Sequence, residues 1–98
     1  DGQWHHLAFT YDETTSILKV YFDGVEVPTP GTSGNFGIGK LNLANATNLG
    51  VGGWNKQAGI SGPTDSWISG FSGKMDQFRL YGKTLSASEV LALFNSKL

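Results

Sequence analysis

The sequence predicts an all-β fold, an antiparallel β-sandwich completed by one short C-terminal helix. Three observations predict it: 14 glycines with a single methionine in 98 residues, segments in which apolar side chains alternate, and tight-turn signals between them. Val, Phe, Tyr, Trp and Thr favour strands, and Gly favours turns. Because 98 residues with 39% hydrophobic content can form only one core, residues 1–98 are expected to be a single domain.

The first third of the chain predicts a hairpin with a short return strand. The expected strands span residues 4–11, 17–23 and 25–27. Asp23-Gly24 is a strong hairpin signal, because Gly tolerates the positive φ of a tight primed turn. Side chains two apart share a face of a strand. The face of the second strand expected to point into the core carries Leu18, Val20 and Phe22.

The middle and end of the chain predict further strands with weaker patterns. Leu41 and Leu43 suit a brief strand, and residues 48–53 suit a buried one with glycines where backbones approach closely. Residues 54–70 form a long polar loop, which is the expected functional surface. Residues 71–81 are expected to form the last strand.

A short helix is expected to close the domain. Ser86 and Glu89 have the spacing of a capping box, in which the hydroxyl accepts a backbone N–H and the carboxylate reaches back to the cap. Three apolar residues at helical spacing then pin the helix against the sandwich: Val90, Leu93 and Phe94.

Charge and composition exclude several kinds of partner. Seven basic and eight acidic residues are scattered along the chain, so no basic patch attracts nucleic acid or anionic lipid. No apolar run approaches the roughly 20 residues that span a bilayer, so we expect no membrane insertion. The chain has no cysteine, which excludes disulfides. It starts at Asp1, directly before a strand-like run, as a piece of a longer protein would.

Five stretches occur in a recognisable order. They are WHHLA at 4–8, LKVYFDG at 18–24, LGVGG at 49–53, FSGKMDQFRLY at 71–81 and LS at 85–86. Together they resemble the C-terminal half of a laminin-G-like domain, in the jelly-roll, concanavalin-A-like lectin group. The resemblance implies a non-catalytic carbohydrate-binding or adhesion module of an extracellular or cell-surface protein. The alternative is a structural or assembly domain that self-associates or binds protein, without a sugar site.

The resemblance also implies that strands usually present before residue 4 are missing here. A half sandwich would expose apolar faces and unpaired edges. A second copy, another chain or a smaller self-contained arrangement would therefore have to cover them. We favour association between copies through strand sharing, and the alternative is a compact monomer.

Two kinds of ligand are expected. Asp76 shares a strand face with Phe78 and Leu80, so its carboxylate needs hydrogen bonds or a cation. In similar domains the matching acidic residue often helps to hold a structural Ca²⁺, and the alternative is that Asp76 accepts backbone N–H groups. The long loop offers indoles that could stack on a sugar ring, with polar groups for its hydroxyls. The expected sugar-binding residues are Trp54, Asn55, Lys56, Gln57, Asp65 and Trp67.

The remaining candidates point away from catalysis. His5 and His6 lie on opposite faces of one strand, so they cannot chelate one ion together. The alternative for Trp54 and Trp67 is that each caps the core. Glycoside hydrolysis needs two carboxylates facing one cleft, and no such pair is evident. We therefore expect no enzymatic activity.

Overall fold

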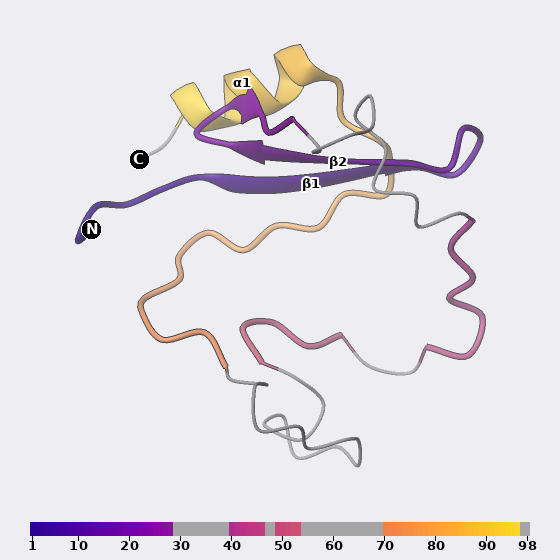
Figure 1. Cartoon of the computed structure of the whole chain (residues 1–98), viewed down its shortest axis with the longest axis horizontal. Coiled ribbons are helices and arrows are strands. Elements are labelled where there is room, and N and C mark those ends of the chain that lie inside the picture. Colours follow the sequence, from indigo (N-terminus) through magenta and orange to yellow (C-terminus); the bar gives the residue numbers. More distant parts are fainter. Residues whose placement is uncertain (29–39, 47–48, 54–69, 97–98) are drawn as a thin grey trace. The chain divides into compact units, whose positions relative to one another are not determined.

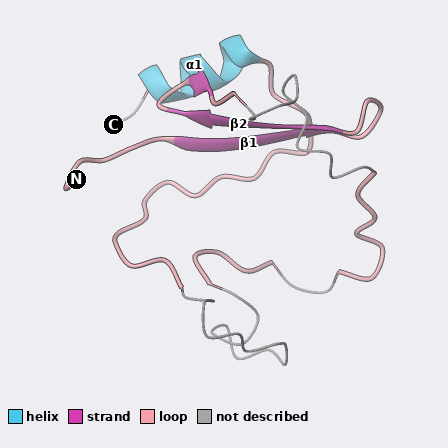
Figure 2. Cartoon of the chain, viewed as in Figure 1, coloured by secondary structure: helices cyan, strands magenta, loops and turns pink. Residues whose placement is uncertain are grey.

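A computed structural model describes residues 1–28, 40–46, 49–53 and 70–96. The elements follow in the order β1 (Leu7–Asp12), β2 (Ile17–Phe22), β3 (Val25–Glu26) and α1 (Ala87–Asn95) (Figures 1 and 2). The chain divides into two compact units. The first combines Asp1–Asn42 with Leu80–Leu98, and the second is Leu43–Arg79. None of the helices in the described ranges is both long and apolar enough to cross a bilayer.

The predicted hairpin is confirmed. β1 and β2 pair antiparallel from Leu7 opposite Phe22 to Asp12 opposite Ile17, and the sheet order is β1-β2-β3. The β2–β3 turn has φ of 50° at Asp23 and 81° at Gly24. Positive φ at both central residues is what a type I′ turn requires, and this turn matches the natural twist of the strands it joins. The Asp-Gly pair thus sets the register of the return strand.

Gly24 is also a contact point between the hairpin and α1. A Cβ added there would lie 2.9 Å from Leu91 Cδ1 and 3.2 Å from Phe94 Cδ1, with φ already in the left-handed region. We therefore expect Gly24→Ala to lower the free energy of unfolding by about 1–3 kcal/mol through backbone strain and crowding. Urea unfolding measures this cost. Gly82→Ala is the matched control, since nothing lies within 4 Å of its added Cβ; equal costs at both glycines would contradict the proposed contact.

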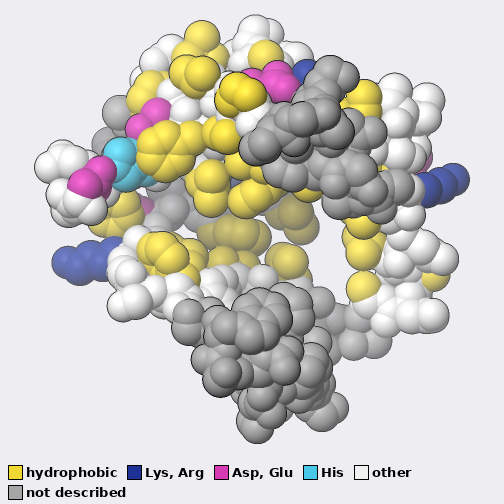
Figure 3. Space-filling model, in the orientation of Figure 1, with side chains coloured by type: hydrophobic (Ala, Val, Ile, Leu, Met, Phe, Trp, Pro, Cys, Tyr) yellow, Lys and Arg dark blue, Asp and Glu magenta, His cyan; other side chains and the backbone are white. Residues whose placement is uncertain are grey.

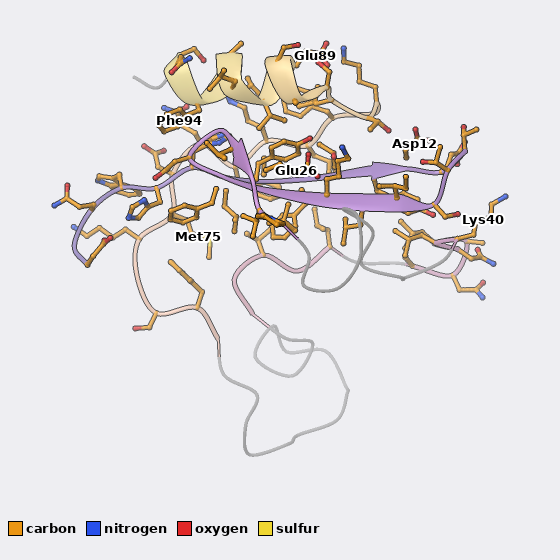
Figure 4. The ribbon with its side chains drawn as sticks, turned by 45° about the horizontal axis from the view of Figure 1, so that its top comes forward. Asp12, Glu26, Lys40, Met75, Glu89 and Phe94 are labelled. Atoms are coloured by element: carbon orange, nitrogen blue, oxygen red, sulfur yellow. The ribbon has the colours of Figure 1, made fainter. Side chains whose placement is uncertain are left out.

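The predicted capping box is confirmed at the start of α1. Glu89 N–H donates to Ser86 Oγ at 3.2 Å, and Ser86 N–H donates to Glu89 Oε2 at 2.8 Å. Lys83 Nζ donates to the second carboxylate oxygen of Glu89 at 2.6 Å. The Glu89 carboxylate therefore connects the preceding loop to the first turn of α1 (Figure 4).

The Glu89 contacts predict how stability varies with pH. The hydrogen bond from Lys83, and then the Ser86 N–H, lower the pKa of Glu89. A carboxylate with a lowered folded-state pKa stabilises the fold above its unfolded pKa, and this contribution is lost as the pH falls through the lowered value. Glu89→Gln should therefore lower the melting temperature at neutral pH and have little effect in strong acid. Ser86→Ala should instead cost about 1 kcal/mol at either pH. A pH-independent effect of Glu89→Gln would contradict the assignment.

The core of the hairpin lies between the sheet and α1. Thr10, Tyr21 and Val90 are buried, and the two sheet residues share one face. His6, on the same face of the β1 segment, lies against Phe94 with ring centroids 6.1 Å apart. In Figures 1 and 4, α1 runs alongside the hairpin, with Phe94 on the side toward it. The helix thus covers the face formed by alternate residues from His6 onward.

The expected core face of β2 is only partly buried within the hairpin unit. Leu18 and Val20 are half-buried and Phe22 is 45% exposed, whereas Tyr21 on the opposite face is 2% exposed. The alternation was right, but both faces of β2 are largely apolar, so the pattern alone could not tell which one the helix covers. The sequence did not show that α1 covers the face of β2 that carries Tyr21.

The face of the sheet away from α1 is called here the open face. Most of its side chains are apolar, and hydrophobic side chains reach the surface in several places in the space-filling view (Figure 3). Its members follow from the pairing of β1 with β2 and of β2 with β3. They are Leu7, Phe9, Tyr11, Leu18, Val20, Phe22, Val25 and Val27. The Tyr11 hydroxyl accepts the Leu41 N–H at 2.8 Å.

The other predicted strands are absent from the described residues. Residues 41–43, 49–53 and 71–81 have no strand pairing, and a second sheet is not formed by the described ranges. Phe78 and Leu80, predicted to point inward, are 59% and 78% exposed. An extended segment becomes a strand only when its backbone groups find a neighbouring strand. The apolar alternation is present in these segments, but the described ranges offer them no strand partner.

Candidate functional site

The predicted sugar-binding residues lie outside the described residues. Trp54, Asn55, Lys56, Gln57, Asp65 and Trp67 all belong to residues 54–69. The described residues on either side of this segment, in the same unit, are joined to each other. Phe71 N–H donates to the Gly52 carbonyl at 2.6 Å, so the two ends of the predicted ligand loop are held together.

The base of this loop is packed as well as hydrogen-bonded. Gly52 has φ of 72°, and Met75 Cε occupies the place where a Cβ would project from it. A Cβ on Gly70 would lie 3.3 Å from the Gly52 carbonyl oxygen. A side chain at Gly52 would be disfavoured by the positive φ, and a side chain at Gly70 by the close approach of the Gly52 carbonyl. Gly52, one of the glycines for which close backbone approach was predicted, thus lies where the two ends of the loop meet.

Asp76, the predicted metal ligand, is exposed in the same unit. Its Oδ1 accepts the N–H of Gln77 at 2.7 Å, and Gln77 adopts φ of 52°. The Gln77 amide oxygen in turn accepts from Arg79 Nη2 at 3.1 Å. The structure therefore shows the alternative use of Asp76, as an acceptor of a backbone N–H. Within the described ranges, no three His, Cys, Asp or Glu side chains gather closely enough to hold a metal ion.

A polar cluster at the hairpin end was not foreseen. His5 lies between two carboxylates, with Nδ1 2.8 Å from Asp23 Oδ2 and Nε2 2.8 Å from Asp1 Oδ2. The ring can donate to both only when each nitrogen carries a proton. Asp23 Oδ1 also accepts the His6 N–H at 2.8 Å. Asp23 was read only as a turn residue; its second role required knowing that the turn folds back beside the start of the chain.

His5 and His6 lie on opposite faces, as their neighbours show. His5 stacks on Phe22 of the open face with ring centroids 4.7 Å apart, and His6 lies against Phe94 of α1. Both histidines thus pack against aromatic rings, on opposite faces of the strand, as predicted from their adjacent positions. His6 Nδ1 is buried without a hydrogen-bond partner, so this ring contributes packing against the helix.

The hairpin, its tight turn and the capped C-terminal helix together match a known family. A laminin G family model, described as the concanavalin A-like lectin/glucanases superfamily, matches residues 1–91. The chain belongs to this superfamily. The laminin-G-like resemblance seen in the sequence is therefore confirmed, and it extends through the first turns of α1.

Two relatives of this superfamily domain are informative. It is 33% identical over 97 residues to the sushi, von Willebrand factor type A, EGF and pentraxin domain-containing protein 1 of Rattus norvegicus, with 98% of the chain and 2% of that protein covered. It also resembles a crystal structure of an S-layer domain-containing protein from Clostridium thermocellum, with TM-score 0.64, 24% identity, and coverage of 96% of this chain and 40% of that one. The second likeness supports the fold, and the chain spans less than half of either relative.

Proposed function

We propose that this domain is a non-catalytic, carbohydrate-binding module of an extracellular or cell-surface protein. The observation that carries the proposal is the closure of residues 54–69 at their base by the Phe71 N–H to Gly52 carbonyl hydrogen bond. This bond keeps the ends of a segment holding two tryptophans within a short distance of each other. Membership of a superfamily named for lectins supports the ligand class, and the two relatives support a surface setting.

The proposed chemistry follows from the residue types. An indole face offers a flat apolar surface for the C–H groups of a pyranose ring, as Trp54 and Trp67 would. Amide and carboxylate groups suit the alternating donors and acceptors of sugar hydroxyls, and Asn55, Gln57 and Asp65 supply them. Lys56 would add a donor for an acidic sugar.

The test is a glycan array followed by titration of the best ligand, read by tryptophan fluorescence. Trp54→Ala and Trp67→Ala should each weaken binding by at least about tenfold, which corresponds to about 1.4 kcal/mol of lost stacking. Trp4→Phe is the matched control, because Trp4 is 65% exposed and lies in the other unit. Absence of any glycan ligand, or equal losses in all three variants, would refute the sugar site.

Calcium binding at Asp76 remains a separate prediction. Calcium takes six to eight oxygen ligands, and no cluster of three His, Cys, Asp or Glu side chains is found among the described residues. If residues beyond the described ranges complete a site, an excess of chelator should lower the melting temperature, and Asp76→Asn should remove that dependence. An identical melt with chelator and with added Ca²⁺ would contradict the prediction.

A further inference from the structure

The His5 ring joins two segments of the hairpin unit that are distant in sequence. Its Nε2 lies 2.8 Å from Asp1 Oδ2, and its Nδ1 lies 2.8 Å from Asp23 Oδ2. Each carboxylate uses its other oxygen to accept a backbone N–H, from Gln3 in the case of Asp1 and from His6 in the case of Asp23. All of these residues belong to the first compact unit. The ring therefore connects the start of the chain to the β2–β3 turn.

The two contacts can exist together only when the His5 ring is charged. An ionised carboxylate accepts hydrogen bonds and donates none, so each ring nitrogen must carry a proton. A neutral imidazole has one N–H and one lone pair, and a lone pair 2.8 Å from a carboxylate oxygen is repelled by it. Histidine is the side chain that normally changes charge between about pH 5 and pH 8. The joined arrangement therefore depends on pH in this range.

Three elements surround the His5 ring. Among the described residues, the charged groups in contact with it are the carboxylates of Asp1, from its own segment, and of Asp23, from the β2–β3 turn. β2 contributes the ring of Phe22, which is stacked on the imidazole with centroids 4.7 Å apart. The imidazole is thus held by an acceptor at each nitrogen and by an aromatic ring against its plane.

The two carboxylates are not anchored equally. Asp23 makes two further contacts with the backbone of His6: its Oδ1 accepts the His6 N–H, and its own N–H donates to the His6 carbonyl, each at 2.8 Å. The second oxygen of Asp1 accepts the N–H of Gln3, which lies in the same short segment and does not tie that segment to the sheet. If one contact of the ring must be lost, the contact with Asp1 is therefore the weaker of the two.

We propose that His5 is a pH-dependent clasp between residues 1–4 and the β2–β3 turn. With a proton on both nitrogens, the ring donates to Asp1 and to Asp23. As the pH rises, Nε2 gives up its proton to the solvent, Nδ1 keeps its N–H toward Asp23, and Asp1 is released. The joined form binds one proton more than the released form, so it is favoured below this titration and lost above it. The clasp involves none of the predicted sugar-binding residues and is independent of the proposed function.

The test is nuclear magnetic resonance of the isotope-labelled chain at about pH 5 and about pH 8. The chemical shifts of the ring nitrogens report which of them carries a proton, and Cα relaxation of Gly2 and Gln3 reports backbone order. We expect protons on both nitrogens of His5 at the lower pH and on Nδ1 alone at the higher pH. The order parameters of Gly2 and Gln3 should fall from about 0.8 to below about 0.6, the values of rigid and of flexible backbone.

Two variants separate the clasp from a general effect of pH. Asp1→Ala removes the acceptor that faces Nε2, so Gly2 and Gln3 should be flexible at both pH values. Glu13→Ala is the matched control and should keep the wild-type response, because Glu13 is an exposed acidic residue in the β1–β2 turn, at the far end of β1 from His5. Three outcomes would overturn the proposal: a proton on Nε2 alone at the higher pH, equal backbone order at both pH values in the wild type, and a wild-type response in Asp1→Ala.

Discussion

Phe94→Ala is expected to lower the free energy of unfolding by about 3 kcal/mol, at the lower end of the range for a large core truncation because the ring is only half-buried. Phe94 lies against His6, which directly precedes β1, and against Gly24 in the β2–β3 turn. Removing the ring would leave a void at the junction of helix and hairpin. Urea unfolding followed by far-ultraviolet circular dichroism measures the loss.

Asn95→Ala is the matched control for Phe94→Ala. Asn95 is exposed in the same final turn of α1, so its replacement should change the free energy of unfolding by less than about 0.5 kcal/mol. If Phe94→Ala costs no more than this control, α1 is peripheral to the hairpin unit. The packing described for Phe94 would then be wrong.

Asp23→Ala is expected to cost about 2–3 kcal/mol. The carboxylate accepts the His6 N–H at one oxygen and contacts the His5 ring at the other, each at 2.8 Å. Asp also tolerates the left-handed φ of 50° better than Ala does. Loss of a hydrogen bond costs about 1 kcal/mol, and backbone strain adds about 1–2 kcal/mol. Thermal and urea unfolding of the wild type and the variant measure the sum.

Asp23→Asn separates the turn from the charge. Asn retains an oxygen for the His6 N–H and accepts positive φ, but it removes the negative charge beside His5. We expect a cost below about 1 kcal/mol, since the contact between Asp23 and His5 is only partly buried. If Asp23→Asn lowers the free energy of unfolding as much as Asp23→Ala does, the contact with His5 contributes more to stability than the turn conformation.

Local sequence signals predicted the local elements well. Asp23-Gly24 and the capping box of Ser86 and Glu89 each specify a hydrogen-bond pattern within a few residues, and both are present in the structure. β2 ends one residue before the predicted end, whereas β1 begins at Leu7 and not at the predicted residue 4. Alternation over six residues is a strong signal for a strand but a weak one for its boundary. These features need no knowledge of distant parts of the chain.

Non-local features were predicted less well, for a common physical reason. Residues 71–81 alternate like a strand, but alternation does not supply the neighbouring backbone that strand pairing requires. The burial of Tyr21 beneath α1 was not predicted, because Tyr21 and Phe22 are equally suited to burial and only the position of α1 distinguishes them within the hairpin unit. The residues predicted to bind sugar, between Trp54 and Trp67, lie outside the described residues, so that prediction awaits the glycan experiment.

A hydrogen bond joins β1 to the segment that precedes α1, and it bears on how far the length of the chain between them can change. Thr84 Oγ1 donates to the Tyr11 carbonyl at 2.7 Å, across 73 positions of sequence. The entropy lost in closing such a long connection grows only logarithmically, by about 0.6 kcal/mol for each doubling of its length. Lengthening or shortening residues 43–79 should therefore barely alter the stability of the hairpin and its helix. The segment predicted to meet ligands can change in length while the part that carries it stays folded.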